Sequence, residues 1–145
     1  MNEKEAQRGK LRLRKPNNAI CINTSMDGDF FKWWCTYLRP QIKLTDREAD
    51  VVASFLKFRH ELSKSILDPA ILDAMVMSDT TKQKVLEDCK ITLQHFYVVM
   101  SSLRKNGIIV GNTLSPSLIP NIREDDDGTF QLLILFKTKE KRNDV

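Results

Sequence analysis

The side chains of this sequence best suited to chemistry are basic groups crowded near its N-terminus. Residues 1–17 hold six basic residues and two acidic ones, a net charge of +4, which equals the formal net charge of +4 for all 145 residues. The other residues are therefore neutral as a set. Because lysine and arginine neutralise phosphate charge, we predict that Arg12, Arg14 and Lys15 contact the backbone or minor groove of a nucleic acid. The segment Lys10–Pro16 has two other interpretations. Its alternation of Leu and Arg suits a strand added to another subunit's sheet edge, and charged tails also serve as solubilising segments.

No pattern of residues in the sequence is typical of a catalytic or metal site. Two histidines are present, His60 and His95, and the cysteines Cys21, Cys35 and Cys89 lie far apart without the CxxC spacing of a zinc or redox site. There is no glycine-rich phosphate loop and no recognisable pairing of a nucleophile with a base. We therefore expect a non-enzymatic protein with no metal ion, no cofactor and no small-molecule ligand. The odd, scattered cysteines favour buried thiols in a reducing compartment.

A helix predicted at residues 93–105 is the element that would present a binding surface. Thr92 suits its N-terminus, because a threonine hydroxyl accepts a hydrogen bond from a free backbone N–H of the first turn. Asn106 and Gly107 end it, since glycine readily adopts the left-handed conformation that follows a helix. Successive side chains rotate by about 100°. The side chains predicted to face the core are Leu93, Phe96, Tyr97, Val99, Met100 and Leu103, and those predicted to face outward are Gln94, His95, Val98, Ser101, Ser102 and Lys105.

Signals for other helices surround this one. Leu44–Ala49 combines a capping box with a hydrophobic staple. Asp68-Pro69 begins another helix, and Ser78 caps the short helix that precedes the turn before residue 93. An aromatic helix, residues 30–38, ends before Pro40, and its rings fill the core or form a partner-binding face. The sequence thus predicts a mostly α-helical domain with a small β-sheet, the α+β class.

Three apolar segments predict short strands, at residues 19–22, 108–110 and 130–136. The last strand follows the acidic turn Glu124–Asp127. Three interpretations of this turn are open. It is a solvated loop tip, or it contacts a basic partner such as the arm of a neighbouring copy. The third is a calcium site, although the run lacks the alternating spacing of an EF-hand loop. We expect three parts: a flexible basic arm (1–18), a folded domain (19–137) and a charged tail (138–145).

The segment Lys84–Leu114, KVLEDCKITLQHFYVVMSSLRKNGIIVGNTL, resembles the winged helix-turn-helix proteins found among bacterial regulators and small phage-encoded proteins. A helix that ends in an apolar turn with Ile91-Thr92 leads into a second helix and then into LRKNGII. LTDRE, residues 44–48, resembles the opening of a scaffold helix in the same group. The resemblance implies a winged helix-turn-helix with an N-terminal basic arm, in which residues 93–105 form the recognition helix.

The resemblance further implies that this helix reads double-stranded DNA in the major groove. Gln94 is suited to adenine, Lys105 to guanine or phosphate, and Val98 to a thymine methyl group. Thr92 lies at the helix N-terminus, where backbone N–H groups can meet a phosphate. His95 is open to two interpretations, as a solvated surface histidine or as a base or phosphate contact. The full DNA-binding set is Arg12, Arg14, Lys15, Thr92, Gln94, His95, Val98, Ser101, Ser102 and Lys105.

Two functions follow from these expectations. The first is a transcriptional regulator or phage DNA-binding protein. The second is a phage virion or packaging protein that uses the fold for protein–protein contacts, as a homo-oligomer whose arm pairs with a neighbouring subunit. The helix pattern from Thr92 to Gly107 and the basic arm support the first, which is the leading hypothesis. The mild charge of the outward face and the acidic run, which phosphates would repel, are the grounds for the second. No apolar run approaches the ~18 residues that a membrane span needs, and the sequence shows no signal peptide. We therefore expect a protein that does not bind a membrane. We expect it in the cytoplasm, or in the host cytoplasm or virion if it is phage-encoded.

Overall fold

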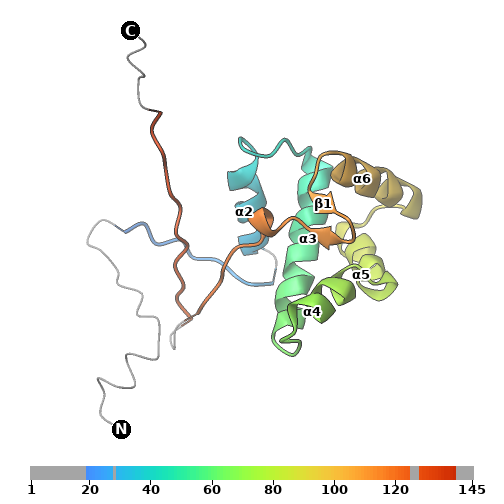
Figure 1. The fold of residues 1–145 in the computed structure, drawn as a ribbon, viewed down its shortest axis with the longest axis horizontal. Helices are drawn as coiled ribbons and strands as arrows, with labels where there is room; N and C mark the ends of the chain where they lie inside the picture. The colour runs from blue at the N-terminus through green and yellow to red at the C-terminus, as the bar shows by residue number, and fades with distance from the viewer. Residues whose placement is uncertain (1–18, 28, 125–127, 140–145) are drawn as a thin grey trace. The chain divides into compact units, whose positions relative to one another are not determined.

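The computed structural model describes residues 19–27, 29–124 and 128–139 of the chain. The chain divides into two units, Cys21–Ile119 and a second unit made of Met1–Ile20 and Pro120–Val145. In the first unit, helices pack around the long α3, and a short hairpin and a 3-10 turn follow α6 (Figure 1). The expected α+β class is confirmed. The elements are α2 (Asp29–Leu38), α3 (Asp46–Ser63), α4 (Pro69–Val76), α5 (Asp79–Cys89), α6 (Leu93–Lys105), β1 (Ile109–Val110), β2 (Thr113–Leu114) and η1 (Pro116–Leu118).

The predicted caps begin the helices as expected, with one difference at α3. The hydroxyl of Thr45 accepts a hydrogen bond from the backbone N–H of Glu48 at 3.2 Å, and Asp68 and Ser78 cap α4 and α5. The carboxylate of Glu48 does not close the capping box. It lies against α6, where its Oε1 accepts a hydrogen bond from Ser102 at 3.4 Å, while Oε2 is buried without a hydrogen-bond partner. This side chain therefore joins two helices.

The core is built on α3, which contacts α2, α4, α5 and α6. Its residues Val51–Leu56 form a continuous buried run, because helices cover it on several sides. From α6, the buried side chains are Phe96, Val99, Met100 and Leu103. The rings of Phe55 and Phe96 lie 6.3 Å apart between centroids. Burial of such side chains stabilises a fold by about 1.5–3 kcal/mol each, so α3 fixes the position of α6.

Part of the aromatic group of α2 belongs to the same core, which confirms the core interpretation for Phe30 and Trp34. Phe30, Phe31 and Trp34 are buried, whereas Trp33 is 37% exposed. The indole Nε1–H of Trp34 donates a hydrogen bond of 2.7 Å to the backbone carbonyl of Leu118. This bond holds the segment after the hairpin against α2.

The sheet has two strands, within the two or three that the sequence predicts, but only one of them is a predicted segment. Residues 19–22 and 130–136 form no strand, so two of the three strand predictions are wrong. The prediction at residues 108–110 is confirmed as β1, whose antiparallel partner is β2 across the turn Gly111-Asn112. A turn with positive φ at its first residue, +61° at Gly111, joins strands locally, and closing so short a loop costs less entropy than reaching a distant segment.

The hairpin turns at Gly111-Asn112, and the acidic run Glu124–Asp127 is not part of it. Residues 125–127 of that run lie outside the described residues, as do the arm (1–18) and the end of the tail (140–145).

Candidate nucleic-acid interface

The best-defined candidate site is α6 together with the turn that precedes it. α5 ends at Cys89, and Lys90 takes the left-handed conformation, with φ 52° and ψ 46°. The turn Lys90–Thr92 then leads into α6. A short turn between two helices is the connection of a helix-turn-helix. Lys90 is exposed, so its ammonium group reaches solvent at the start of α6.

The first turn of α6 is capped and open to solvent. The hydroxyl of Thr92 accepts a hydrogen bond from the backbone N–H of His95 at 3.1 Å, as the sequence predicts. The N–H groups of Leu93 and Gln94 come before the first intrahelical bond and have no carbonyl partner within the helix. Both residues are exposed, so a phosphate could approach these N–H groups and the positive end of the helix dipole.

Four predicted site residues share the outward face of α6. Gln94, Val98, Ser101 and Lys105 are all exposed, at steps of four, three and four residues, so they form one strip along the helix. Val98 is 65% exposed. His95 is also exposed, at the edge of the strip. The helix therefore presents an amide, a methyl-bearing side chain, a hydroxyl and an ammonium group in line.

The predicted faces of α6 need three corrections. Ser102 is half-buried and directed to Glu48 of α3, so it does not belong to the exposed strip. Leu93 and Tyr97, predicted to face the core, are 54% and 62% exposed. Phe96, Val99, Met100 and Leu103 already fill the contact with α3, and Leu93 and Tyr97 lie at the edge of that stripe, outside the contact.

The residues of α6 and of the chain that follows it to Ile119 include no acidic side chain. From Lys90 to Ile119 the sequence contains no Asp or Glu, while Lys90, Arg104 and Lys105 are basic and exposed. The sequence alone could have revealed this stretch. The net charge of residues 18–145 is zero, and that sum hides the absence of acidic residues between Lys90 and Ile119. This stretch adds Lys90 and Arg104 to the residues that could meet phosphates.

A groove of about 330 Å³ is lined by residues of α2 and α3, by Asp27, and by Asp88, Cys89 and Lys90 at the end of α5, so Lys90 lies in the same groove as several carboxylates. Lys57 Nζ lies 2.9 Å from Asp88, and the hydroxyl of Ser54 donates to the same carboxylate at 2.7 Å. Burial opposes ionisation of Asp88, but these two contacts hold its pKa below the usual value. The acidic groups lining the groove are Asp27, Asp29, Asp50 and Asp88.

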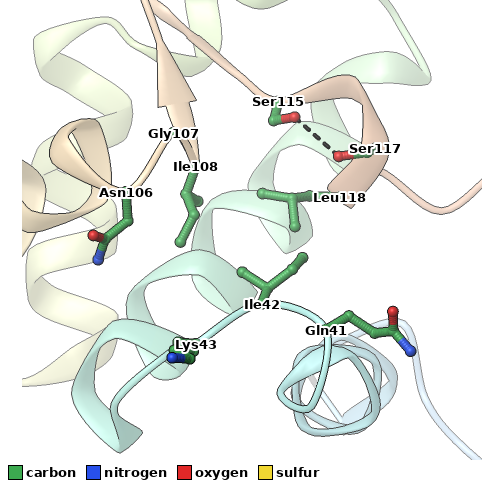
Figure 2. Close-up of a pocket in the computed structure, with 9 residues that line it drawn as sticks. All are labelled: Gln41, Ile42, Lys43, Asn106, Gly107, Ile108, Ser115, Ser117 and Leu118. Carbon is green, nitrogen blue, oxygen red and sulfur yellow. Dashed lines mark hydrogen bonds between the residues drawn. The ribbon is translucent and has the colours of Figure 1, made fainter.

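A second cleft, of about 490 Å³, lies where α6 ends and the hairpin begins. Figure 2 shows Ile42, Ile108 and Leu118 close together, with polar side chains around them. The hydroxyls of Ser115 and Ser117 are 3.0 Å apart and hydrogen-bonded to each other. No carboxylate lines this cleft, and Lys43 is its basic residue. Most of its lining residues belong to the acid-free stretch of chain that contains α6.

The cysteines form no redox or metal site in the part of the chain that the structure describes. Cys35 is buried and Cys89 half-buried, but Cys21 is exposed, which contradicts the prediction of buried thiols for that residue. Burial raises the pKa of Cys35 to about 12 and that of Cys89 to about 11. Within residues 19–27, 29–124 and 128–139, no three His, Cys, Asp or Glu residues come together as candidate metal ligands. None of the described helices combines the length and apolar character of a membrane span.

The chain matches no family model, no curated protein and no solved structure. Arg12, Arg14 and Lys15 of the predicted site lie outside the described residues.

Proposed function

We propose that this protein binds double-stranded DNA as a winged helix-turn-helix. In this proposal α6 enters the major groove and the hairpin β1–β2 acts as a short wing. The observation that carries the proposal is the exposed strip Gln94, Val98, Ser101 and Lys105, which follows a short turn in a stretch of chain without carboxylates.

The chemistry of the strip suits base edges more than it suits a simple phosphate contact. An amide at Gln94 can pair with adenine, a methyl group at Val98 can contact thymine, and an ammonium at Lys105 can bind guanine or phosphate. The basic residues beside the strip, Lys90 and Arg104, would hold the DNA backbone. In the proposal, the arm residues Arg12, Arg14 and Lys15 add further phosphate contacts. The protein would then act as a transcriptional regulator or a phage DNA-binding protein.

Fluorescence anisotropy of a labelled duplex tests this proposal. We expect binding at about 50 mM salt that weakens steeply by about 200 mM, because each neutralised phosphate releases counterions. Gln94→Ala with Lys105→Ala should reduce affinity, by about 1–3 kcal/mol if Gln94 makes a bidentate base contact. Lys64→Ala is the matched control: Lys64 is exposed at the end of α3 far from Glu48 and α6.

Two results would count against DNA recognition by α6. The first is the absence of duplex binding at low salt. The second is binding that Lys64→Ala weakens as much as the α6 double variant does, because the affinity would then arise from net charge alone.

A second candidate function is protein assembly, and the surface of α6 supplies an observation in its favour. Leu93, Tyr97 and Val98 are 54%, 62% and 65% exposed on one helix. Exposed apolar side chains that lie together are typical of protein contacts. A virion or packaging protein would use this surface to bind a protein and not DNA. Tyr97→Ser would then change the oligomeric state or partner binding, whereas a DNA-binding protein with this substitution would keep its size.

A further inference from the structure

The cleft between the end of α6 and the loop before α3 has the size of a small-molecule site. Its volume of about 490 Å³ lies within the roughly 300–1,000 Å³ of ligand pockets. Its lining comes from three segments that are distant in sequence, residues 41–43, 106–108 and 115–118, all within the unit Cys21–Ile119. No local motif connects these segments, so the sequence-based expectation of no small-molecule ligand could not take this cleft into account.

The floor of the cleft is aliphatic and held in place by hydrogen bonds. Figure 2 shows the side chains of Ile42, Ile108 and Leu118 close together. The carbonyl of Ile108 accepts a hydrogen bond from the backbone N–H of Ser115 at 2.8 Å, and the carbonyl of Leu118 accepts one from Trp34 at 2.7 Å. A floor that is already ordered lowers the cost of binding. Because Ile108 and Leu118 are each 2% exposed, the apolar surface is small and suits a short chain.

The rim of the cleft carries polar side chains that are not used elsewhere in the described part of the chain. Gln41, Lys43 and Asn106 are exposed, and their side chains make no hydrogen bond or ion pair with another described residue. The acidic residue that follows Lys43 most closely in sequence is Asp46, whose carboxylate pairs with Arg39 at 2.7 Å. The ammonium group of Lys43 is therefore available to a ligand.

The charge and the hydrogen-bond donors of the cleft favour an anion. Of the nine described residues that line it, Lys43 is the one that carries a charge. The C-terminal end of a helix places roughly half a negative charge nearby, but the full charge of Lys43 exceeds it, and Arg104 and Lys105 in the last turn of α6 also offset it. The hydroxyls of Ser115 and Ser117 share one hydrogen bond of 3.0 Å, so one of them keeps a proton free to donate.

We propose that this cleft binds a small organic carboxylate with a short apolar chain. The chain lies on the aliphatic floor of Ile42, Ile108 and Leu118, and Lys43 with the polar groups of the rim binds the carboxylate. A carboxylate fits better than a phosphate monoester, because one lysine balances a single negative charge and a phosphate monoester carries about 1.5–2. The inference does not depend on DNA binding.

Titration of the isotope-labelled full chain with hexanoate, followed by two-dimensional NMR of the backbone amides, tests the proposal. We expect saturation with a dissociation constant of about 1 mM, and chemical-shift changes concentrated at the residues that line the cleft. Two further probes separate the contributions. Acetate has the charge without the chain, and hexylammonium has the chain with the opposite charge, so each should bind at least about tenfold more weakly than hexanoate.

A pair of lysine variants tests the role of charge within the cleft. Lys43→Gln keeps a long polar side chain without the charge and should raise the dissociation constant of hexanoate at least about fivefold. Lys64→Gln is the matched control, because Lys64 is exposed at the other end of α3, about 27 Å away along that helix, and should leave binding unchanged. The NMR spectrum of each variant also reports whether it is folded.

Four results would overturn the proposal. The first is no saturable shift change up to about 20 mM hexanoate. The second is equal binding of hexanoate and hexylammonium, and the third is a set of shift changes that lies away from the cleft. The fourth is a Lys43→Gln variant that binds hexanoate as tightly as Lys64→Gln does.

Discussion

Replacing Trp34 with Phe should destabilise the helical unit through one hydrogen bond. Both residues are buried: Trp34 is 8% exposed and Leu118 is 2% exposed. The indole N–H of Trp34 donates a hydrogen bond of 2.7 Å to the backbone carbonyl of Leu118. Phenylalanine keeps an aromatic ring in the core but has no N–H, so the carbonyl is left buried without its donor. An unsatisfied buried group costs about 1–3 kcal/mol, and the smaller ring adds a cavity. In a domain of this size, each kcal/mol of lost stability lowers the melting temperature by about 4–8 °C. The melting temperature of the variant should therefore fall by at least about 4 °C.

Trp33 supplies the control for this substitution. Both tryptophans lie close to the rings of Phe30 and Tyr37, but Trp33 is 37% exposed. Trp33→Phe should therefore change the free energy of unfolding by no more than about 0.5 kcal/mol. Thermal unfolding followed by circular dichroism measures both variants. Equal losses for the two would refute the reasoning, because general loss of aromatic area, and not the bond to Leu118, would then explain the effect.

Three other predictions concern caps, pH and thiols. Thr92→Ala should cost about 0.5–2 kcal/mol of unfolding free energy in thermal melts while Thr92→Ser costs little, because the hydroxyl caps α6; equal losses would contradict this. The pKa of Asp88 lies below its ordinary value of 3.8. The wild type should therefore be more stable than Asp88→Asn above pH 3.8, and this difference in stability should shrink as the pH falls below 3.8. A difference in melting temperature that grows in acid would contradict the prediction. Brief alkylation near pH 8, read by peptide mass spectrometry, should label exposed Cys21 before Cys35 and Cys89, whose pKa values are raised to about 12 and about 11; equal labelling would disprove the burial argument.

The helices could be predicted from the sequence because their signals are local. Thr92 accepts a hydrogen bond from a residue three positions away, and Gly107 takes φ +75° directly after α6. Such contacts involve neighbours along the chain, so the residue types reveal them. For the same reason the bounds of α6, Leu93–Lys105, agree with the prediction from its caps.

The strands and the edges of the helix face could not be predicted in this way. Phe130–Phe136 has the composition of a strand but forms none, because composition alone does not decide whether a segment joins a sheet. Leu93 and Tyr97 are apolar and lie near the core face of α6, yet they are exposed because α3 contacts only a narrow stripe of the helix. The role of Ser102 depends on Glu48, 54 residues earlier in the sequence. Contacts across such distances are decided by packing.

The small number of basic side chains on α6 bears on how tightly the protein would bind DNA. The exposed strip of α6 carries Lys105 as its basic residue, and Lys90 and Arg104 are also exposed, so in the proposed complex one copy would neutralise few phosphates through α6. Affinity for DNA grows with the number of phosphates neutralised. Two linked copies double that number, and the second binding event becomes intramolecular, which raises the overall affinity without a new kind of contact. The mild charge of α6 is therefore consistent with the proposed DNA binding when two copies of the protein act together.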